Sequence, residues 1–280
     1  MQYIEIVCKI SNPIVGNEIM IAILGDMGCD SFVENSDGIL AYIPKQNFEK
    51  EQLEEVLEYA QNFDFEIDIS FNEVEEQDWN AKWESEYQPV LIDDRCYVRA
   101  PFHDKKDDVD YDILIEPKMS FGTAHHPTTS QIISYLLEED CQGKTCLDMG
   151  TGTGVLAILA AKRGAKSILA IDNDEWAYRN CLENVEKNHL NNIINVVLGD
   201  ANSIKRMEYD IVIANINRNI LLRDMQYYVQ YLKKDGILYL SGFYKEPDLQ
   251  MLVAKAQQFN VFLDTYKEKD NWVAARLQKK

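Results

Sequence analysis

Three features that would place a protein in a particular class are missing from this sequence of 280 residues. Its six cysteines form no CxxC pair and no cluster with the four histidines, so the sequence indicates neither a disulfide framework nor a metal site. No apolar run approaches the roughly 20 residues that span a bilayer. The amino terminus lacks a basic segment followed by an apolar one, so nothing indicates secretion. We therefore expect a cytoplasmic globular protein without a metal ion and without a membrane contact.

Basic residues are scarce in the first third of the chain. Residues 1–90 hold 20 of the 47 acidic residues and only 4 of the 28 basic ones, a net charge of −16. The remaining 190 residues carry a net charge of only −3. An acidic module repels the phosphates of nucleic acid and attracts a basic partner, although it can also be a solvated surface that aids solubility. We expect no direct nucleic-acid substrate.

The pattern over residues 1–71 predicts a small α+β domain. Alternating apolar residues indicate strands, apolar residues three and four apart indicate helices, and Asn35-Ser-Asp-Gly38 is a good tight-turn sequence. The expected elements are strands over 3–10, 31–34, 39–43 and 65–71 and helices over 17–27 and 48–60. This βαββαβ order is typical of a ferredoxin-like domain, which implies no activity of its own. Residues 72–94 follow as an acidic linker with a short helix over 79–87.

Strands alternate with helices over residues 95–280. The expected strands cover 96–100, 111–116, 145–149, 167–171, 193–198, 209–214, 236–241, 261–266 and 271–277, and the expected helices cover 155–163, 175–188, 219–232 and 248–259. Because this alternation is typical of a parallel, doubly wound sheet, we expect an α/β domain of the Rossmann-like type. The last two strands are separated only by a short turn, which predicts an antiparallel pair at one edge.

A glycine-rich turn lies where the strand over 145–149 meets the following helix. Its sequence is Asp-Met-Gly-Thr-Gly-Thr-Gly, with glycines at Gly150, Gly152 and Gly154. Glycine lets the backbone pass close to a ligand where a Cβ would collide, and the amino end of a helix presents unpaired N–H groups. Open α/β sheets bind ligands at the carboxyl ends of their strands. The turn therefore predicts a cofactor site, with a turn that needs glycine for packing alone as the alternative.

Two acidic residues and one valine indicate which cofactor this turn favours. The dinucleotide fingerprint has glycine or alanine where this sequence has Val155. Asp148, at the strand end, can order the loop and accept from a cofactor ammonium group through water, whereas its charge would repel a pyrophosphate. Asp172 ends the next strand, where a carboxylate can accept hydrogen bonds from both ribose hydroxyls of either cofactor. The turn thus favours S-adenosylmethionine over a nicotinamide dinucleotide.

Polar residues follow two further strands of the predicted sheet. Asn215 comes directly after the strand over 209–214, where it faces the reactive end of the expected cofactor, and we take it as the candidate for the catalytic position. A strand-end asparagine is otherwise a routine turn or capping residue. Asp200 follows the strand over 193–198 as the adenine-binding acid does in many methyltransferases.

The segment over 116–129, Glu-Pro-Lys-Met-Ser-Phe-Gly-Thr-Ala-His-His-Pro-Thr-Thr, strongly resembles a segment of the bacterial PrmA family. Members of that family methylate large-subunit ribosomal protein eleven. The match includes the distance of about 21 residues from Thr129 to Gly150, the acid at Asp172, and the stretches 214–216 and 241–242. The resemblance covers about residues 72–280 well. It implies a seven-stranded class I methyltransferase domain over 95–280, preceded by a ferredoxin-like substrate-recognition domain over 1–71.

The resemblance also implies roles for individual residues. The implied cofactor contacts are Thr129, Gly150, Asp172 and Asn215, with Phe121, Gly122 and Thr123 in a loop over the methionine end of S-adenosylmethionine. To these the glycine-rich turn adds Asp148, Gly152 and Gly154, and Asp200 is a further candidate that the family does not consistently show. The implied substrate is a lysine or amino-terminal amine of a basic ribosomal protein, and we expect the enzyme to be a monomer.

Methyl transfer to an amine is an in-line displacement, so the enzyme chiefly aligns an unprotonated nitrogen with the methyl group. We hypothesise that the side-chain oxygen of Asn215 and the backbone carbonyl of Ile216 accept N–H bonds from the amine and direct its lone pair. Phe121 would cover the sulfonium through a cation–π contact. His126 is expected to brace the loop by a hydrogen bond, with a role as a base as the alternative.

Three positions depart from the family pattern. Ala124 replaces a glycine, and Asn217 and Arg218 stand where the family often has an apolar or aromatic residue. These departures keep open a non-catalytic cofactor-binding protein that attaches to ribosome precursors. A methyltransferase for another protein or for a small molecule is a second alternative. A nicotinamide oxidoreductase is a third, which Val155 disfavours.

Overall fold

The computed structural model describes residues 3–61, 63, 65–73, 87–118 and 120–280, and the chain divides into two compact units, Met1–Glu86 and Tyr87–Lys280. The helix predicted over 79–87 falls almost entirely on residues outside the described ranges. In the described part of the chain, every helix is too short or too polar to cross a lipid bilayer.

The first unit consists of an antiparallel four-stranded sheet and two helices. Its strand order is β2-β3-β1-β4. The elements are β1 (Tyr3–Ile10), α1 (Pro13–Asp26), β2 (Ser31–Asn35), β3 (Gly38–Pro44), the short helix η1 (Lys45–Asn47), α2 (Lys50–Ala60) and β4 (Ile67–Glu73). Ile4 and Ile6 of β1 pack against Met20 and Leu24 of α1 in one core. Helix α1 begins earlier than predicted, because the fixed φ of Pro13 suits the first helical turn.

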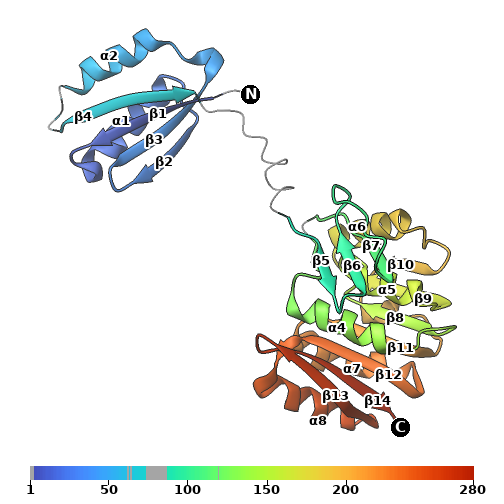
Figure 1. Cartoon of the computed structure of the whole chain (residues 1–280). Coiled ribbons are helices and arrows are strands. Elements are labelled where there is room, and N and C mark those ends of the chain that lie inside the picture. The colour runs from blue at the N-terminus through green and yellow to red at the C-terminus, as the bar shows by residue number, and fades with distance from the viewer. Residues whose placement is uncertain (1–2, 62, 64, 74–86, 119) are drawn as a thin grey trace. The chain divides into compact units, whose positions relative to one another are not determined.

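The second unit is built on a seven-stranded sheet in the order β10-β9-β8-β11-β12-β14-β13 (Figure 1). Strands β8 to β12 are parallel, and β14 runs antiparallel to β12 and β13. The elements are β8 (Thr145–Met149), α5 (Val155–Lys162), β9 (Ser167–Asp172), α6 (Glu175–Lys187), β10 (Ile194–Leu198), η2 (Ala201–Ser203), β11 (Tyr209–Asn215), α7 (Arg218–Gln230), β12 (Leu232–Tyr244), η3 (Lys245–Leu249), α8 (Gln250–Gln257), β13 (Val261–Lys269) and β14 (Trp272–Lys279). The predicted α/β class is confirmed. Strand β12 is longer than the predicted range 236–241, because Leu232 pairs with Tyr209 and Tyr244 with Trp272.

A three-stranded sheet precedes helix α4 (Pro127–Glu138). Strand β5 (Val90–Ile92) pairs antiparallel with β6 (Cys96–Arg99), and β6 pairs parallel with β7 (Tyr111–Leu114). Strand β5 falls in the range predicted as a linker. Because β6 and β7 are parallel, the chain between them crosses from one end of the pair to the other and does not form a hairpin turn. Buried side chains of all three strands join the core formed with α4 and α5.

Helices cover both faces of the seven-stranded sheet. Successive residues of β8 belong to different cores: Cys146 packs with α4 and α5 on one face, and Leu147 packs with α7 and α8 on the other. Strands β9 and β10 lie on one side of β8, and β11 and β12 lie on its other side. The order therefore reverses between β8 and β11, and the crevice at the carboxyl ends of such strands is where open α/β sheets bind ligands.

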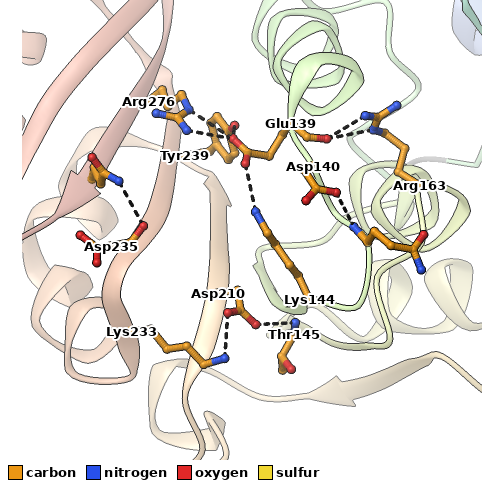
Figure 2. Close-up of polar contacts among 12 residues, drawn as sticks. Glu139, Asp140, Lys144, Thr145, Arg163, Asp210, Lys233, Asp235, Tyr239 and Arg276 are labelled. Atoms are coloured by element: carbon orange, nitrogen blue, oxygen red, sulfur yellow. Dashed lines mark hydrogen bonds and ion pairs between the residues drawn. The ribbon is translucent and has the colours of Figure 1, made fainter.

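A polar network lies away from that crevice, at the end of α4 and the start of β8 (Figure 2). The buried carboxylate of Glu139 accepts hydrogen bonds from Tyr239 Oη at 2.7 Å, Arg276 Nη2 at 3.0 Å and Lys144 Nζ at 3.2 Å. Its backbone carbonyl accepts from Arg163 Nη2 at 2.7 Å. Burial alone raises the pKa of the Glu139 carboxyl, but the hydrogen bonds from Tyr239 and Arg276 and the nearby positive charges outweigh burial and hold the pKa below its ordinary value.

Replacing Glu139 with glutamine is expected to lower the free energy of unfolding by about 2–3 kcal/mol at pH 7, because a neutral amide removes the charge that Arg276 Nη2 and Lys144 contact, although Arg276 still pairs with Asp264. The folded-state pKa is depressed, so this stabilisation is present above the unfolded pKa of about 4.3 and is lost as the pH falls through the folded value. The free energy of unfolding in urea, measured for wild type and Glu139→Gln at pH 7 and pH 3.5, tests both the loss of stability and its pH dependence. The gap between wild type and variant should shrink at pH 3.5, and an equal gap at both pH values would contradict this account.

Candidate active site

Three strand ends of the second unit meet around one cavity. Gly150 follows β8, Asp172 ends β9 and Asn215 ends β11, and all three line a cavity of about 930 Å³. Cofactor sites span roughly 300–1,000 Å³, so the cavity is large enough for a nucleoside cofactor. Other lining residues are Phe121, Gly152, Asp174, Trp176, Ile216 and Trp272. The predicted convergence of strand-end residues is therefore present in the structure.

The three glycines of the turn are needed for close contacts within the protein. All three have a positive φ, 67° at Gly150, 56° at Gly152 and 82° at Gly154. A Cβ on Gly152 would lie 2.2 Å from the carbonyl oxygen of Phe121, and one on Gly150 would lie 2.2 Å from Ile216 Cγ2. The nearest atoms belong to neighbouring segments of the chain, so packing requires these glycines, and the approach of a ligand stays a prediction. Gly150 and Gly152 line the cavity as well, whereas Gly154 precedes α5 outside the lining.

Asp172 holds the glycine-rich turn and faces the cavity. Its Oδ2 accepts a hydrogen bond from the backbone N–H of Gly152 at 2.9 Å, and its Oδ1 accepts from the N–H of Asp174 at 3.0 Å. The side chain keeps 9% of its area exposed, on the cavity side. A carboxylate has about four acceptor sites, so two remain for ligand hydroxyl groups. Asp174 caps helix α6, because its Oδ1 accepts from the N–H of Ala177 at 2.9 Å.

Asp148 lies beneath the turn and does not line the cavity. Its Oδ2 accepts from Thr151 Oγ1 at 2.7 Å, which orders the loop as expected. Its Oδ1 is buried and has no hydrogen-bond partner among the described residues. Burial raises the pKa of the Asp148 carboxyl to about 7, while the hydrogen bond from Thr151 opposes that rise.

Asn215 lines the cavity and carries a buried acceptor without a partner among the described residues. Its Nδ2 donates to Thr129 Oγ1 at 3.1 Å, and its Oδ1 is this acceptor. Thr129 is fully buried and does not line the cavity, so it reaches the site only through Asn215. Ile216 lines the cavity. Its backbone carbonyl oxygen lies against Gly242, since a Cβ on that glycine would be only 2.4 Å from the oxygen.

The predicted loop over the methionine end is only partly at the cavity. Phe121 lines it with 55% of its side chain exposed, and its ring lies 5.3 Å from that of His126. Gly122 and Thr123 are outside the lining: the Gly122 carbonyl accepts from Thr153 Oγ1, and Thr123 Oγ1 lies 3.1 Å from a ring nitrogen of His125.

His126 caps helix α4. Its Nδ1 accepts from the backbone N–H of Thr128 at 3.3 Å, and burial lowers the pKa of its imidazole. This contact fits the expected bracing role. Among the described residues, no group of three His, Cys, Asp or Glu side chains is arranged to hold a metal ion.

The departures from the family pattern have local explanations. Asn217 caps helix α7, because its Oδ1 accepts from the N–H of Ile220 at 3.2 Å. Arg218 Nη1 donates to Asp248 Oδ1 at 2.8 Å, which ties the start of α7 to η3. Ala124 is buried with a φ of 70°, a conformation that a glycine adopts more easily. These side chains thus have structural partners of their own.

Sequence reasoning missed two tryptophans of the cavity and included two acids that lie outside its lining, Asp148 and Asp200. Trp176 lines the cavity with 78% of its side chain exposed, and Trp272 lines it from the start of β14. The position of Trp176 two residues after Asp174 is a local signal, but no local pattern connects Trp272 to the site. Asp200 is outside the lining and caps η2 through the N–H of Asn202 at 2.9 Å.

The cavity suits S-adenosylmethionine by the chemistry of its acceptors. Buried acceptors without partners are costly, and Asn215, a lining residue, carries an Oδ1 that lacks a partner among the described residues. Asp172 adds acceptors for ribose hydroxyls at the cavity wall. A ligand with hydroxyls and a positive charge suits these acceptors, whereas a pyrophosphate would meet the charges of Asp172 and Asp174.

The raised pKa of Asp148 predicts that the affinity for S-adenosylhomocysteine increases about tenfold from pH 6 to pH 8. A folded pKa above the unfolded value of about 3.9 means that stability is lost as the pH rises through 7 and the buried carboxyl ionises. Asp148 does not line the cavity, so a ligand ammonium group would favour its ionised form through a bridging water, and binding would then release a proton. Calorimetry on wild type and Asp148→Asn measures this. An equal pH dependence in the variant would exclude Asp148 as its source.

Comparisons with known proteins agree with this site. The family model "Ribosomal protein L11 methyltransferase (PrmA)" matches residues 21–280. A ribosomal protein L11 methyltransferase of Phocaeicola vulgatus is 44% identical over 262 residues, 93% of this chain and 92% of that protein. That of Chlorobaculum parvum is 35% identical over 289 residues, 99% and 97% of the two chains. The crystal structure of a ribosomal protein L11 methylase from Lactobacillus delbrueckii subsp. bulgaricus superposes with a TM-score of 0.62 at 25% identity, covering 69% of this chain and all of that one.

The family match covers both the cavity residues and most of the first unit, and the relatives are matched over nearly their whole length. The resemblance that the segment over 116–129 indicated is thereby confirmed, and the α/β methyltransferase fold is shared with the solved L11 methylase. The chain therefore belongs to the PrmA family of ribosomal protein L11 methyltransferases and is a methyltransferase that uses S-adenosylmethionine.

Proposed function

We propose that this methyltransferase moves methyl groups from S-adenosylmethionine to lysine or amino-terminal amines of a basic ribosomal protein, large-subunit protein eleven (L11). The observation that carries the proposal is Asn215, which lines the cavity with Gly150 and whose Oδ1 is a buried acceptor without a partner among the described residues. An amine is a donor and matches that atom. The substrate is the one in the names of the two relatives at 44% and 35% identity.

The two units have different proposed roles. The second unit is proposed as a Rossmann-like class I catalytic domain that begins at Tyr87 rather than at residue 95, because β5 pairs with β6. The first unit is proposed as a ferredoxin-like recognition domain, which its antiparallel order β2-β3-β1-β4 supports. We propose that the protein works as a cytoplasmic monomer.

The proposed chemistry depends on placement. When bound, S-adenosylmethionine supplies a methyl group on a positively charged sulfur, from which the methyl is displaced. Asp172 accepts from the ribose hydroxyls, and Asn215 Oδ1 and the Ile216 carbonyl accept from the amine N–H groups. A lysine amine has an ordinary pKa of about 10.4, so a partly dry cavity that disfavours the ammonium form increases the reactive fraction. Phe121, exposed at the cavity, is placed to cover the sulfonium.

The charge of the first unit supports a basic protein as the substrate. Helix α2 exposes Glu51, Glu54, Glu55 and Glu58 along its length, with Lys50 as its single basic residue. Such a surface attracts a basic protein and repels nucleic acid, so we exclude RNA from the proposal. Because salt screens these charges, we expect the association of L11 with the enzyme to slow as the ionic strength rises.

The experiment that tests the function is the transfer of a labelled methyl group from S-adenosylmethionine to purified L11. Cytochrome c, which is similarly basic, and free lysine serve as alternative acceptors in parallel reactions. Label on L11 alone is the expected result. Label on the other acceptors at an equal rate would reject L11 as the specific substrate, and bound cofactor without label on any acceptor would favour a non-catalytic binding protein.

A further inference from the structure

Thr153 connects the glycine-rich turn to the loop that carries Phe121. Its side chain is fully buried and does not line the cavity. Its backbone N–H donates to the carbonyl of Phe121 at 2.9 Å, and its Oγ1 donates to the carbonyl of Gly122 at 2.6 Å. Its own carbonyl accepts from Asn184 Nδ2 at 2.9 Å. Every polar group of Thr153 is therefore used between segments that are distant in sequence.

Asn184 extends this connection to the segment before the loop. Its Oδ1 accepts from the N–H of Glu116 at 2.8 Å, while its Nδ2 binds Thr153. Asn188, one helical turn later, binds both backbone groups of Leu114, its Nδ2 at 2.7 Å and its Oδ1 at 3.2 Å. Side chains at the carboxyl end of α6 thus hydrogen-bond to the backbone of residues 114–116. The loop is fixed where it begins and again at Thr153.

The two loops lie so close together that neither Gly152 nor Gly122 can carry a side chain without displacing the other loop. A Cβ on Gly152 would lie 2.2 Å from the Phe121 carbonyl oxygen, and a Cβ on Gly122 would lie 2.8 Å from Thr153 Oγ1. Phe121 itself is the exposed, cavity-lining residue of this loop. Its ring position therefore depends on hydrogen bonds that hold its backbone against the turn.

We propose that the Thr153 hydroxyl is a positioning group that holds the Phe121–Gly122 backbone on the glycine-rich turn, so that the Phe121 ring stays over the methionine end of the cofactor. This inference rests on the proposed function for the place of that ring. Loss of the hydroxyl leaves the Gly122 carbonyl without its donor, and a buried or partly buried carbonyl without a donor favours a displaced loop. The cofactor should then bind less tightly and react more slowly, while the docking of the protein substrate is unaffected.

The test compares four residues at position 153 that differ by one group at a time. Thr153→Val removes the hydroxyl and keeps the shape, Thr153→Ser keeps the hydroxyl, and Thr153→Ala removes both. Thr145→Val, at the far end of β8, is a control for loss of a buried threonine hydroxyl. The readouts are the melting temperature, kcat, KM for S-adenosylmethionine, KM for L11, and the calorimetric Kd for S-adenosylhomocysteine.

We expect kcat/KM for S-adenosylmethionine to fall about tenfold in Thr153→Val and Thr153→Ala. Thr153→Ser should stay within about twofold of wild type, KM for L11 should be unchanged in all variants, and Thr145→Val should behave as wild type. If Thr153→Val does not fold, the pair Thr153→Ala and Thr153→Ser still isolates the hydroxyl.

Two results would overturn the inference. One is wild-type kinetics in Thr153→Val, and the other is an equal loss in Thr153→Ser and Thr153→Ala, which would assign the effect to packing of the methyl group. The calorimetric Kd needs no protein substrate. It therefore tests the inference even if wild-type enzyme fails to label L11, a failure that would count only against the proposed function.

Discussion

An Asp172→Ala variant will bind S-adenosylmethionine at least about a hundredfold more weakly than wild type. The carboxylate has two functions in the site. It offers acceptors to the ribose hydroxyls, and it accepts from the N–H groups of Gly152 and Asp174, which holds the glycine-rich turn against β9. Alanine removes both, so the loss should exceed that of a single charged hydrogen bond. Calorimetry with S-adenosylhomocysteine measures the affinity without turnover.

The isosteric variant makes this prediction sharper. Asp172→Asn should lose nearly as much affinity as the alanine variant, because each carboxylate oxygen already accepts a backbone N–H and an amide nitrogen would face one of these donors. Asp200→Ala is the matched control, since Asp200 caps η2 outside the cavity lining. Wild-type affinity in Asp172→Ala would remove this residue from the site. A large loss of affinity in Asp200→Ala would mean that Asp200 binds the adenine end of the cofactor, as its position in the sequence suggested.

The place of the site along the chain could be predicted because its main residues are strand ends. Gly150, Asp172 and Asn215 each follow a short apolar run, and runs that alternate with helices form a parallel sheet. In such a sheet the carboxyl ends share one edge, so residues far apart in sequence meet there. The order of the strands was not needed for this inference, which is why it succeeded without contact information.

Contributions from outside the parallel strands could not be predicted in the same way. Trp272 reaches the cavity because β12 continues past its apolar run and Tyr244 pairs with Trp272. That register is set by long-range pairing, which leaves no periodic signal near either residue. Strand β5 is only three residues long and pairs with β6. A run this short carries no clear strand pattern, so it was included in the acidic linker predicted over 72–94. Short strands depend on their partners more than on their own sequence.

Residue roles were harder to predict than residue positions. Thr129 matches the family motif, yet it is buried and acts on the cavity only through the Asn215 amide. The positive φ of Gly152 was foreseeable, but its contact with the Phe121 carbonyl oxygen, which excludes a side chain there, was not. A motif specifies which residue type fits a position. Which neighbour makes that residue necessary is a property of the packed structure.

The Asn215→Ala variant is expected to lower kcat about a hundredfold while the Kd for S-adenosylhomocysteine changes less than about threefold. Asn215 Oδ1 is a buried acceptor without a partner among the described residues, and Thr129 Oγ1 fixes the amide by accepting from its Nδ2. Alanine removes the acceptor that orients the amine but leaves Asp172 and the glycine-rich turn unchanged. The rate of methyl transfer in a single turnover, with enzyme in excess of L11, reports the chemical step.

Thr129→Val separates orientation from the presence of the acceptor. Valine keeps the shape of the buried side chain, so Asn215 stays at the cavity wall while its amide loses the Thr129 hydroxyl as partner. An intermediate loss of about tenfold in the single-turnover rate is expected, because the amine then meets an acceptor free to rotate. If Asn215→Ala retains wild-type turnover with cofactor bound, the amide does not orient the amine, and the Ile216 carbonyl becomes the remaining acceptor at this edge of the sheet.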